Sequence, residues 1–224
     1  MTIRKPLVFL ISLYMTLLCT TLVVTHRMVY IDGVLISGGT FILPLTYTIC
    51  DIITEIYGYK VVRCLIWFSQ VCMLVFGLLI LVVMHLPAPP LWHKVKMFEE
   101  VFDPVIIVAL GTIVSGLFGS FINAFMISKW KVLIQGRLFW LRSLGSTAVG
   151  EGIFVILVVL IVFGWRTPWY STFSIMYASY ALKILYNILL VPISSLVVSY
   201  LKSVEGQDVY DTNTNFNPFK LSVA

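Results

Sequence analysis

Charged residues are scarce in this sequence. Lys, Arg, Asp and Glu together make up 11% of the 224 residues, whereas apolar residues make up 60% and the mean hydropathy is +1.01. A water-soluble domain cannot cover its surface with such a composition, so the sequence excludes one.

Catalytic and metal-binding patterns are missing as well. There is no H-E-x-x-H, G-x-S-x-G or Walker sequence, so an enzyme would have neither a nucleophile nor a metal to work with. The four cysteines show no C-x-x-C spacing and are interpreted as small apolar helix residues, with metal or redox chemistry as the alternative. His85, His93, Glu99 and Asp103 fit no standard metal site. We therefore expect a protein that is not an enzyme, with no catalytic residues, no metal site and no cofactor.

Long charge-free runs are what the sequence has instead. Because a spanning helix needs roughly 20 mostly apolar residues, these runs predict an all-α integral membrane protein with six transmembrane helices. The expected helices are residues 6–26, 36–57, 62–86, 104–128, 139–164 and 172–201. They form one transmembrane domain, residues 1–203, whose first helix lacks the cleavage pattern of a signal peptide. Residues 204–224 have little apolar periodicity and are expected to be a disordered cytoplasmic tail.

Basic residues in the short loops predict the orientation of the chain. With the N-terminus inside, the inner side holds Arg4, Lys5, Lys60, Arg63, Lys129, Lys131, Arg137, Lys202 and Lys220, and the outer side holds Arg27, Lys94, Lys96 and Arg166. Both termini are therefore expected in the cytoplasm, and the net charge of +5 reflects topology and not a nucleic-acid surface. The two three-helix halves would then have opposite orientations, as in transporters built from inverted repeats.

The connection at residues 87–103 is the one long loop expected on the outer side. Trp92, Val95, Phe98 and Phe102 lie at a spacing that predicts a short amphipathic helix at the membrane interface. A lid over an outer vestibule is the alternative interpretation.

Small residues recur in the fourth expected helix at a spacing of four, as Gly111, Ser115 and Gly119. Such a ladder indicates close helix packing. It fits contacts within one monomer or between two, so a homodimer remains open.

Four ionisable residues fall inside the expected helices: Asp51, Glu55, Glu151 and Lys183. Since a charge within hydrocarbon costs several kcal/mol, each is a candidate functional residue. Asp51 and Glu55 lie on one face of the second helix, below Pro44, which can kink that helix. The alternative for Glu55 is a simple ion pair at the cytoplasmic interface, next to Lys60.

Lys183 lies near the middle of the sixth helix and shares a face with Tyr180, Asn187 and Ser194. A lysine at that depth cannot easily extend to the membrane surface, so an internal ion pair with Asp51 or Glu151 is expected. Such a pair could be structural or part of a substrate site.

The fifth helix carries Thr147 and Glu151 as neighbours one turn apart, with Arg142 on the opposite face. Arg142 is therefore not expected to pair with Glu151. Gly150 and Gly152 leave room beside Glu151 for another helix or a ligand. In the fourth helix, Asn123 is a further buried hydrogen-bonding group.

One stretch carries a family resemblance. Residues 39–63 read GTFILPLTYTICDIITEIYGYKVVR, and Leu141 and Arg142 lead to a Ser-Thr pair at 146–147 and to Lys183. These residues resemble the signature of the bacterial queuosine-precursor transporters, also called the vitamin uptake family, and the likeness spans most of the chain. Many of these relatives carry acids near the positions of Asn123 and Phe154, so the departures leave the exact ligand open.

The resemblance implies an inner-membrane importer of 7-cyano-7-deazaguanine or 7-aminomethyl-7-deazaguanine, the precursors of the tRNA nucleoside queuosine. A guanine-like edge presents two adjacent N–H groups, which one buried carboxylate can accept together. Amide and ammonium groups can serve the acceptors of the base, and aromatic rings such as that of Phe154 can stack on it. The candidate substrate-binding residues are Tyr47, Asp51, Glu55, Asn123, Glu151, Tyr180, Lys183 and Asn187.

Two other functions remain open. The chain could be the substrate-binding subunit of an ATP-driven importer that docks its partner through the small-residue ladder, or a membrane scaffold whose charges only fix helix packing. The expected partners are the lipid bilayer and a small deazaguanine, and no nucleic acid is expected.

Overall fold

The computed structural model describes residues 4–31, 34–89, 94–164 and 167–220. Its elements are α1 (Lys5–Val24), β1 (Met28–Ile31), β2 (Val34–Ser37), the 3-10 helix η1 (Gly38–Phe41), α2 (Leu43–Tyr57), α3 (Tyr59–Met84), α4 (Val95–Phe102), α5 (Val105–Leu133), α6 (Phe139–Phe163) and α7 (Trp169–Glu205). Six helices are long and apolar enough to cross a membrane, as the sequence predicts. Within the described ranges, the strands β1 and β2 form the only sheet, so the all-α fold class is confirmed.

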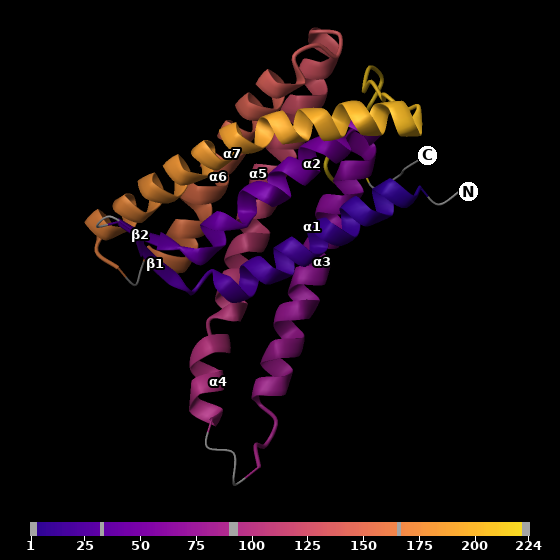
Figure 1. Ribbon diagram of the computed structural model, residues 1–224. Helices are drawn as coiled ribbons and strands as arrows, with labels where there is room; N and C mark the ends of the chain where they lie inside the picture. The colour runs from indigo at the N-terminus through magenta and orange to yellow at the C-terminus, as the bar shows by residue number, and fades with distance from the viewer. Residues whose placement is uncertain (1–3, 32–33, 90–93, 165–166, 221–224) are drawn as a thin grey trace.

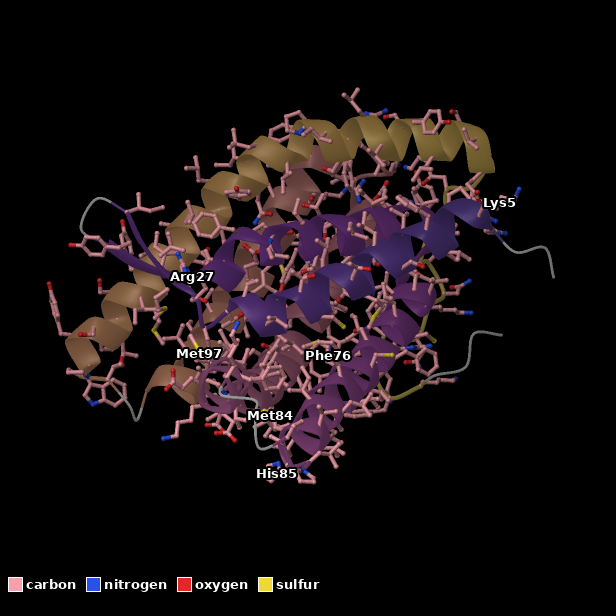
Figure 2. The ribbon with its side chains drawn as sticks, turned by 60° about the horizontal axis from the view of Figure 1, so that its bottom comes forward. Lys5, Arg27, Phe76, Met84, His85 and Met97 are labelled. Carbon is pink, nitrogen blue, oxygen red and sulfur yellow. The ribbon has the colours of Figure 1, made fainter. Side chains whose placement is uncertain are left out.

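Both termini lie at one end of the bundle, and the β1–β2 hairpin lies at the other end of α1, α2 and α7 (Figure 1). We call these the termini end and the hairpin end. Lys5 and Arg27 mark the two ends of α1 in Figure 2. Helix α5 packs along α6 and α3, and α7 packs along α6 and α2. The predicted cytoplasmic placement of the termini and the inverted relation of the two halves stay predictions.

Ionisable side chains are buried in the bundle, and large apolar side chains cover its outer surface. Asp51, Glu151 and Lys183 are at most 2% exposed, whereas Leu79 on α3 and Leu196 on α7 are 61% and 72% exposed. A lipid environment accommodates this distribution, because hydrocarbon solvates apolar side chains and excludes polar ones.

The start of the second spanning segment differs from the expected helix at residue 36. Residues 28–37 form an antiparallel hairpin in which Met28 pairs with Ser37, and η1 follows before α2 begins at Leu43. Pro44 lies in the first turn of α2, where its missing N–H costs nothing. It therefore starts the helix, and the kink expected from it is not formed.

The turn between α2 and α3 takes a single residue. Gly58 has φ +82° and ψ 172°, a conformation that side-chain-bearing residues rarely adopt. The sequence predicts a longer break, up to residue 62, because the start of α3 has no separate signal.

The connection before α5 contains the predicted amphipathic helix, α4. The rings of Phe98 and Phe102 contact each other with centroids 4.5 Å apart, while Met97 is 65% exposed. Met84 and His85 at the end of α3 share a surface pocket with Lys96 and Glu99 of α4. Trp92, His93 and Arg166, which also entered the predictions, lie outside the described residues, and the described residues hold no cluster of His, Cys, Asp or Glu suited to a metal ion.

The ladder of small residues packs α5 against α6 within the chain. A side chain at Gly111 would meet Val162 at 2.9 Å, and one at Gly119 would meet the carbonyl oxygen of Gly150 at 2.7 Å. The ladder is therefore already used inside the monomer.

The tail, for which the sequence predicts disorder, folds back across the termini end instead. We call residues 207–220 the strap. Asp211 of the strap is 6% exposed and accepts a hydrogen bond from the backbone N–H of Tyr59 at 2.9 Å. Arg63 donates to the backbone oxygens of Asn215 and Asn217 at 2.9 and 3.0 Å. These contacts join backbone groups to polar side chains and need no regular spacing of apolar residues. The sequence pattern therefore gives no sign of them.

Candidate functional site

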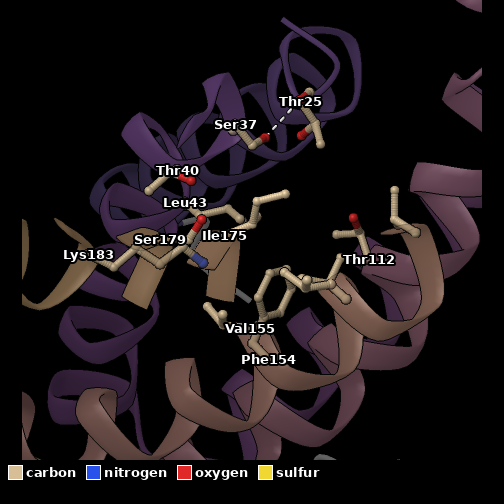
Figure 3. A pocket seen from close by; sticks show the side chains of 14 residues that line it. Thr25, Ser37, Thr40, Leu43, Thr112, Phe154, Val155, Ile175, Ser179 and Lys183 are labelled. Carbon is tan, nitrogen blue, oxygen red and sulfur yellow. Dashed lines mark hydrogen bonds between the residues drawn. The ribbon is translucent and has the colours of Figure 1, made fainter. Parts of the chain in front are cut away.

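A cavity of about 40 Å³ lies inside the bundle, toward the hairpin end. It lies between the end of α1, β2, η1, α2, α5, α6 and α7 (Figure 3). Its walls are mainly apolar, and its polar lining residues are Thr25, Ser37, Thr40, Thr112, Ser179 and Lys183. Small-molecule sites commonly combine such an apolar wall with a few polar groups.

Lys183 is the one charged residue among those that line this cavity. Its side chain extends from α7 opposite Phe154 of α6 (Figure 3), and its Nζ lies 4.5 Å from the centroid of the Phe154 ring. No carboxylate oxygen of the described residues lies within 4.0 Å of this Nζ, so the expected direct ion pair is not formed. The ring offers a weaker, cation–π partner instead.

Glu151 is fully buried next to Lys183 and interacts with it electrostatically. Its Oε2 accepts a hydrogen bond from Nδ2 of Asn187 at 2.8 Å, whereas its Oε1 has no hydrogen-bond partner among the described residues. Buried polar atoms are normally paired, so this oxygen is an exception that needs an explanation. We call Glu151, Lys183, Asn187 and Phe154 the Glu151–Lys183 cluster.

The predicted aromatic residues occupy the space left by glycines in α6. The Tyr47 hydroxyl lies 3.5 Å from the carbonyl oxygen of Gly150, and its ring contacts the edge of Phe154 at a centroid distance of 6.4 Å. Tyr180 donates to the carbonyl oxygen of Ala148 at 3.1 Å. Both tyrosines support the walls, and neither is a lining residue of the cavity.

Asp51 lies one layer deeper and is held by the protein on both oxygens. Its Oδ1 accepts a hydrogen bond from Asn123 at 2.6 Å, and its Oδ2 accepts from Ser143 at 2.5 Å and Thr147 at 2.9 Å. The structure thus brings the predicted residues Asp51 and Asn123 together, and Ser143 and Thr147 of α6 complete the group.

Glu55 lies a further turn along α2, in an ion cluster at the termini end. Arg142 donates to both of its oxygens, at 2.7 and 3.1 Å, and Lys202 donates to Oε1 at 2.7 Å. Lys131 lies 3.6 Å from Oε1 and donates to the backbone oxygen of Glu55 at 2.5 Å. Arg142 is thus turned away from Glu151, as predicted, while Glu55 pairs with these residues and not with Lys60.

A family model described as "Putative vitamin uptake transporter" matches residues 37–197, well over half of the chain. The chain belongs to this family. No curated protein and no solved structure matches it. With six helices able to cross a membrane, this member of the vitamin uptake transporter family is a multi-pass membrane protein.

The matched segment of the vitamin uptake transporter contains the Glu151–Lys183 cluster, Asp51 and Glu55. Lys202 and the strap lie beyond it. The buried acids and all cavity-lining residues except Thr25 thus belong to the part shared with the family, and the ion cluster is completed by residues outside the matched part.

Sequence reasoning missed three residues of the ion cluster in this transporter. In the sequence analysis, Lys131 and Lys202 served only to predict the orientation of the chain in the membrane. Asp208 falls in the tail that was expected to be disordered. Lys131 is 2% exposed because α5 continues to Leu133, five residues past the expected end. Extending the expected fourth helix past residue 128 would have placed this lysine inside the bundle. Its position near the end of a long helix is the signal that could have identified it.

Proposed function

We propose that the chain imports a queuosine precursor, 7-cyano-7-deazaguanine or its aminomethyl relative, across a bacterial inner membrane. One observation carries the proposal. The carboxylate of Glu151 is fully buried, and one of its oxygens has no hydrogen-bond partner among the described residues. It lies behind the cavity wall, next to the buried ammonium of Lys183, which does line the cavity. Leaving such groups unpaired costs at least about 1–3 kcal/mol each, so a bound solute that pairs with both is strongly favoured.

A deazaguanine base matches the chemistry of this cluster. Its ring N–H and exocyclic amine can donate to Glu151, and its carbonyl oxygen can accept from Lys183. The ring of Phe154 lines the same cavity and offers a flat apolar surface. In this proposal Asn187 orients Glu151, because one N–H of its Nδ2 donates to the carboxylate.

Asp51, Asn123 and Glu55 have a supporting role in the proposal. Asp51 already accepts three hydrogen bonds and Glu55 already has its ion-pair partners. We assign these residues to holding α2, α5, α6 and α7 together on the termini side of the cavity.

Transport fits this arrangement better than simple scaffolding. The cavity is lined by residues of the hairpin end, and two layers of buried polar contacts separate it from the termini end. A solute that enters from the hairpin end is therefore held until those layers separate, as alternating access requires.

Binding to the purified chain tests the proposal. A ligand present at about 100 times its Kd stabilises a folded protein by about 2.7 kcal/mol. We expect the cyano or aminomethyl base to raise the Tm of wild type but not of Lys183→Met, with guanine and adenine giving smaller shifts. Ser195→Ala is the matched control, because this α7 hydroxyl bonds only its own helix, to the carbonyl oxygen of Val191. Equal shifts with adenine, or an undiminished shift in Lys183→Met, would contradict the proposal.

Uptake into liposomes that contain the chain alone then separates an importer from a binding subunit. An autonomous importer accumulates or exchanges labelled base without ATP. A chain that binds the base but never moves it would fit the multi-component importer.

A further inference from the structure

The strap and the ion cluster share the same two lysines. Asp208 of the strap contacts Lys131 of α5 at 2.5 Å and Lys202 of α7 at 2.8 Å. The same ammonium groups lie 3.6 and 2.7 Å from Oε1 of Glu55 on α2. Asp208 is therefore the second carboxylate of a five-residue cluster that ties the strap to three spanning helices, with Arg142 contributed by a fourth.

The strap reaches this cluster from a firm anchor on the start of α3. Besides the contacts of Asp211 and Arg63, Trp67 donates to the carbonyl oxygen of Pro218 at 2.8 Å. The indole of Trp67 also contacts the ring of Phe219, with centroids 5.7 Å apart. Residues 208–210 contact α5 and α2 and not α3. Lys131 donates to the backbone oxygen of Val209 at 2.8 Å, and the Val209 N–H donates to the backbone oxygen of Ile56 at 3.3 Å.

Charge balance makes Asp208 decisive for this end of the bundle. The cluster contains two carboxylates and three cations, Lys131, Lys202 and Arg142. Without the Asp208 charge, three cations would face the single carboxylate of Glu55 inside a poorly solvated region. Their repulsion would favour separation of the helices that carry them.

The cluster stands between the cavity and the termini end. Along α2, Tyr47 supports the cavity, Asp51 forms the next layer and Glu55 the last. At a rise of 1.5 Å per residue, Glu55 lies about 12 Å beyond Tyr47. A solute that leaves the cavity toward the termini must pass both layers.

We propose that residues 208–210 of the strap, together with the Glu55 ion cluster, form the gate at the termini end of the transport pathway. The gate opens when Asp208 releases Lys131 and Lys202, while residues 211–220 remain anchored on α3. This gate goes beyond the proposed substrate, because its contacts are independent of what the cavity binds.

A buried reporter thiol tests the gate without any solute. Ser128 of α5 is 2% exposed and lies one turn before Lys131. Its hydroxyl has no hydrogen-bond partner within the described ranges, so Ser128→Cys disturbs little. The four native cysteines are first replaced by alanine, and modification of the full chain by a water-soluble maleimide is then timed. We expect Asp208→Asn to speed modification at position 128 about tenfold, the factor that corresponds to loss of a charged hydrogen bond.

Three controls make the result decisive. Asp208→Glu should retain the slow rate, because it keeps the carboxylate. Asp103→Asn, which removes one carboxylate at the opposite end, should also leave the rate unchanged. A second reporter, Ser69→Cys in the buried part of α3, separates gating from general loosening. An unchanged rate at position 128 in Asp208→Asn, or an equal increase at positions 128 and 69, would overturn the gate while leaving the substrate proposal untouched.

Discussion

Asn187 donates to Oε2 of Glu151 at 2.8 Å and thereby fixes a carboxylate whose other oxygen has no donor in the part of the chain that the structure describes. One oxygen of the acid is used for orientation, and in the proposed function the other pairs with the solute. The two residues come from α6 and α7, whose packing places them side by side. If the proposed function is correct, loss of this carboxylate must weaken binding, which is the first prediction.

Glu151→Gln should weaken binding of the deazaguanine by about 10- to 100-fold, because it removes a charged acceptor worth about 1.5–3 kcal/mol. Titration calorimetry on the purified variant measures this change. The Tm without ligand should also fall, because the buried Lys183 loses its nearby negative charge, although the amide oxygen of the introduced glutamine can still accept from Asn187. Undiminished affinity in a folded variant would show that Glu151 does not contact the solute.

The double variant Glu151→Gln with Lys183→Met should be more stable than wild type when no ligand is present. Replacing a buried, incompletely paired acid and base by neutral side chains of similar volume commonly stabilises a protein by about 1–4 kcal/mol. Thermal unfolding in detergent measures the gain, and uptake assays should show that transport is lost. A double variant that is much less stable than wild type would indicate that the pair serves packing.

Asp51→Asn should act on stability more than on affinity. The new amide keeps one acceptor oxygen and replaces the other by an NH2 group, so it cannot accept all three hydrogen bonds that Ser143, Thr147 and Asn123 now donate to the carboxylate. We expect a cost of about 1–3 kcal/mol in the free energy of unfolding. Uptake should fall with it, while any remaining folded protein binds the base with near-normal Kd. A large rise in Kd at unchanged stability would instead support direct contact of Asp51 with the solute.

Gly58→Ala should loosen the strap. The positive φ of this residue costs a side chain about 1–3 kcal/mol, and the new Cβ would lie 2.8 Å from the Val209 side chain. Hydrogen–deuterium exchange should therefore rise in residues 208–212 and at the α2–α3 junction. Gly206→Ala is a useful comparison, because its φ is also positive but no atom lies within 4 Å of the added carbon. Similar exchange in the two variants would exclude the contact with Val209 as the cause.

Acid should release the strap. Partial burial raises the pKa of Asp208, but hydrogen bonds from Lys131 and Lys202 outweigh it and hold the pKa below its ordinary value of 3.8. A carboxyl whose folded pKa is lowered stabilises the folded form above its unfolded pKa, and this stabilisation is lost as the pH falls through the folded pKa. Exchange protection of residues 208–210, corrected for the intrinsic rate, should thus fall below about pH 4 in wild type and stay constant in Asp208→Asn.

The local pattern of the sequence was sufficient for most of the fold. Six apolar runs gave six spanning helices, because the length and composition needed to cross a bilayer are properties of contiguous residues. The spacing of Phe98 and Phe102 similarly predicted α4. The β1–β2 hairpin and the ordered strap escaped prediction, since both depend on backbone hydrogen bonds that no apolar periodicity reveals.

The sequence by itself determined that Asp51, Glu55, Glu151 and Lys183 are buried within a membrane-spanning bundle, because each interrupts an apolar helix. Only the tertiary structure decided which of them are already paired. Asp51 finds Asn123 72 residues away, and Glu55 finds Lys202 147 residues away, whereas Glu151 keeps one oxygen without a donor. The physical reason is that a hydrogen bond needs atoms within about 3 Å, and helix packing, not helix sequence, sets which side chains come that close.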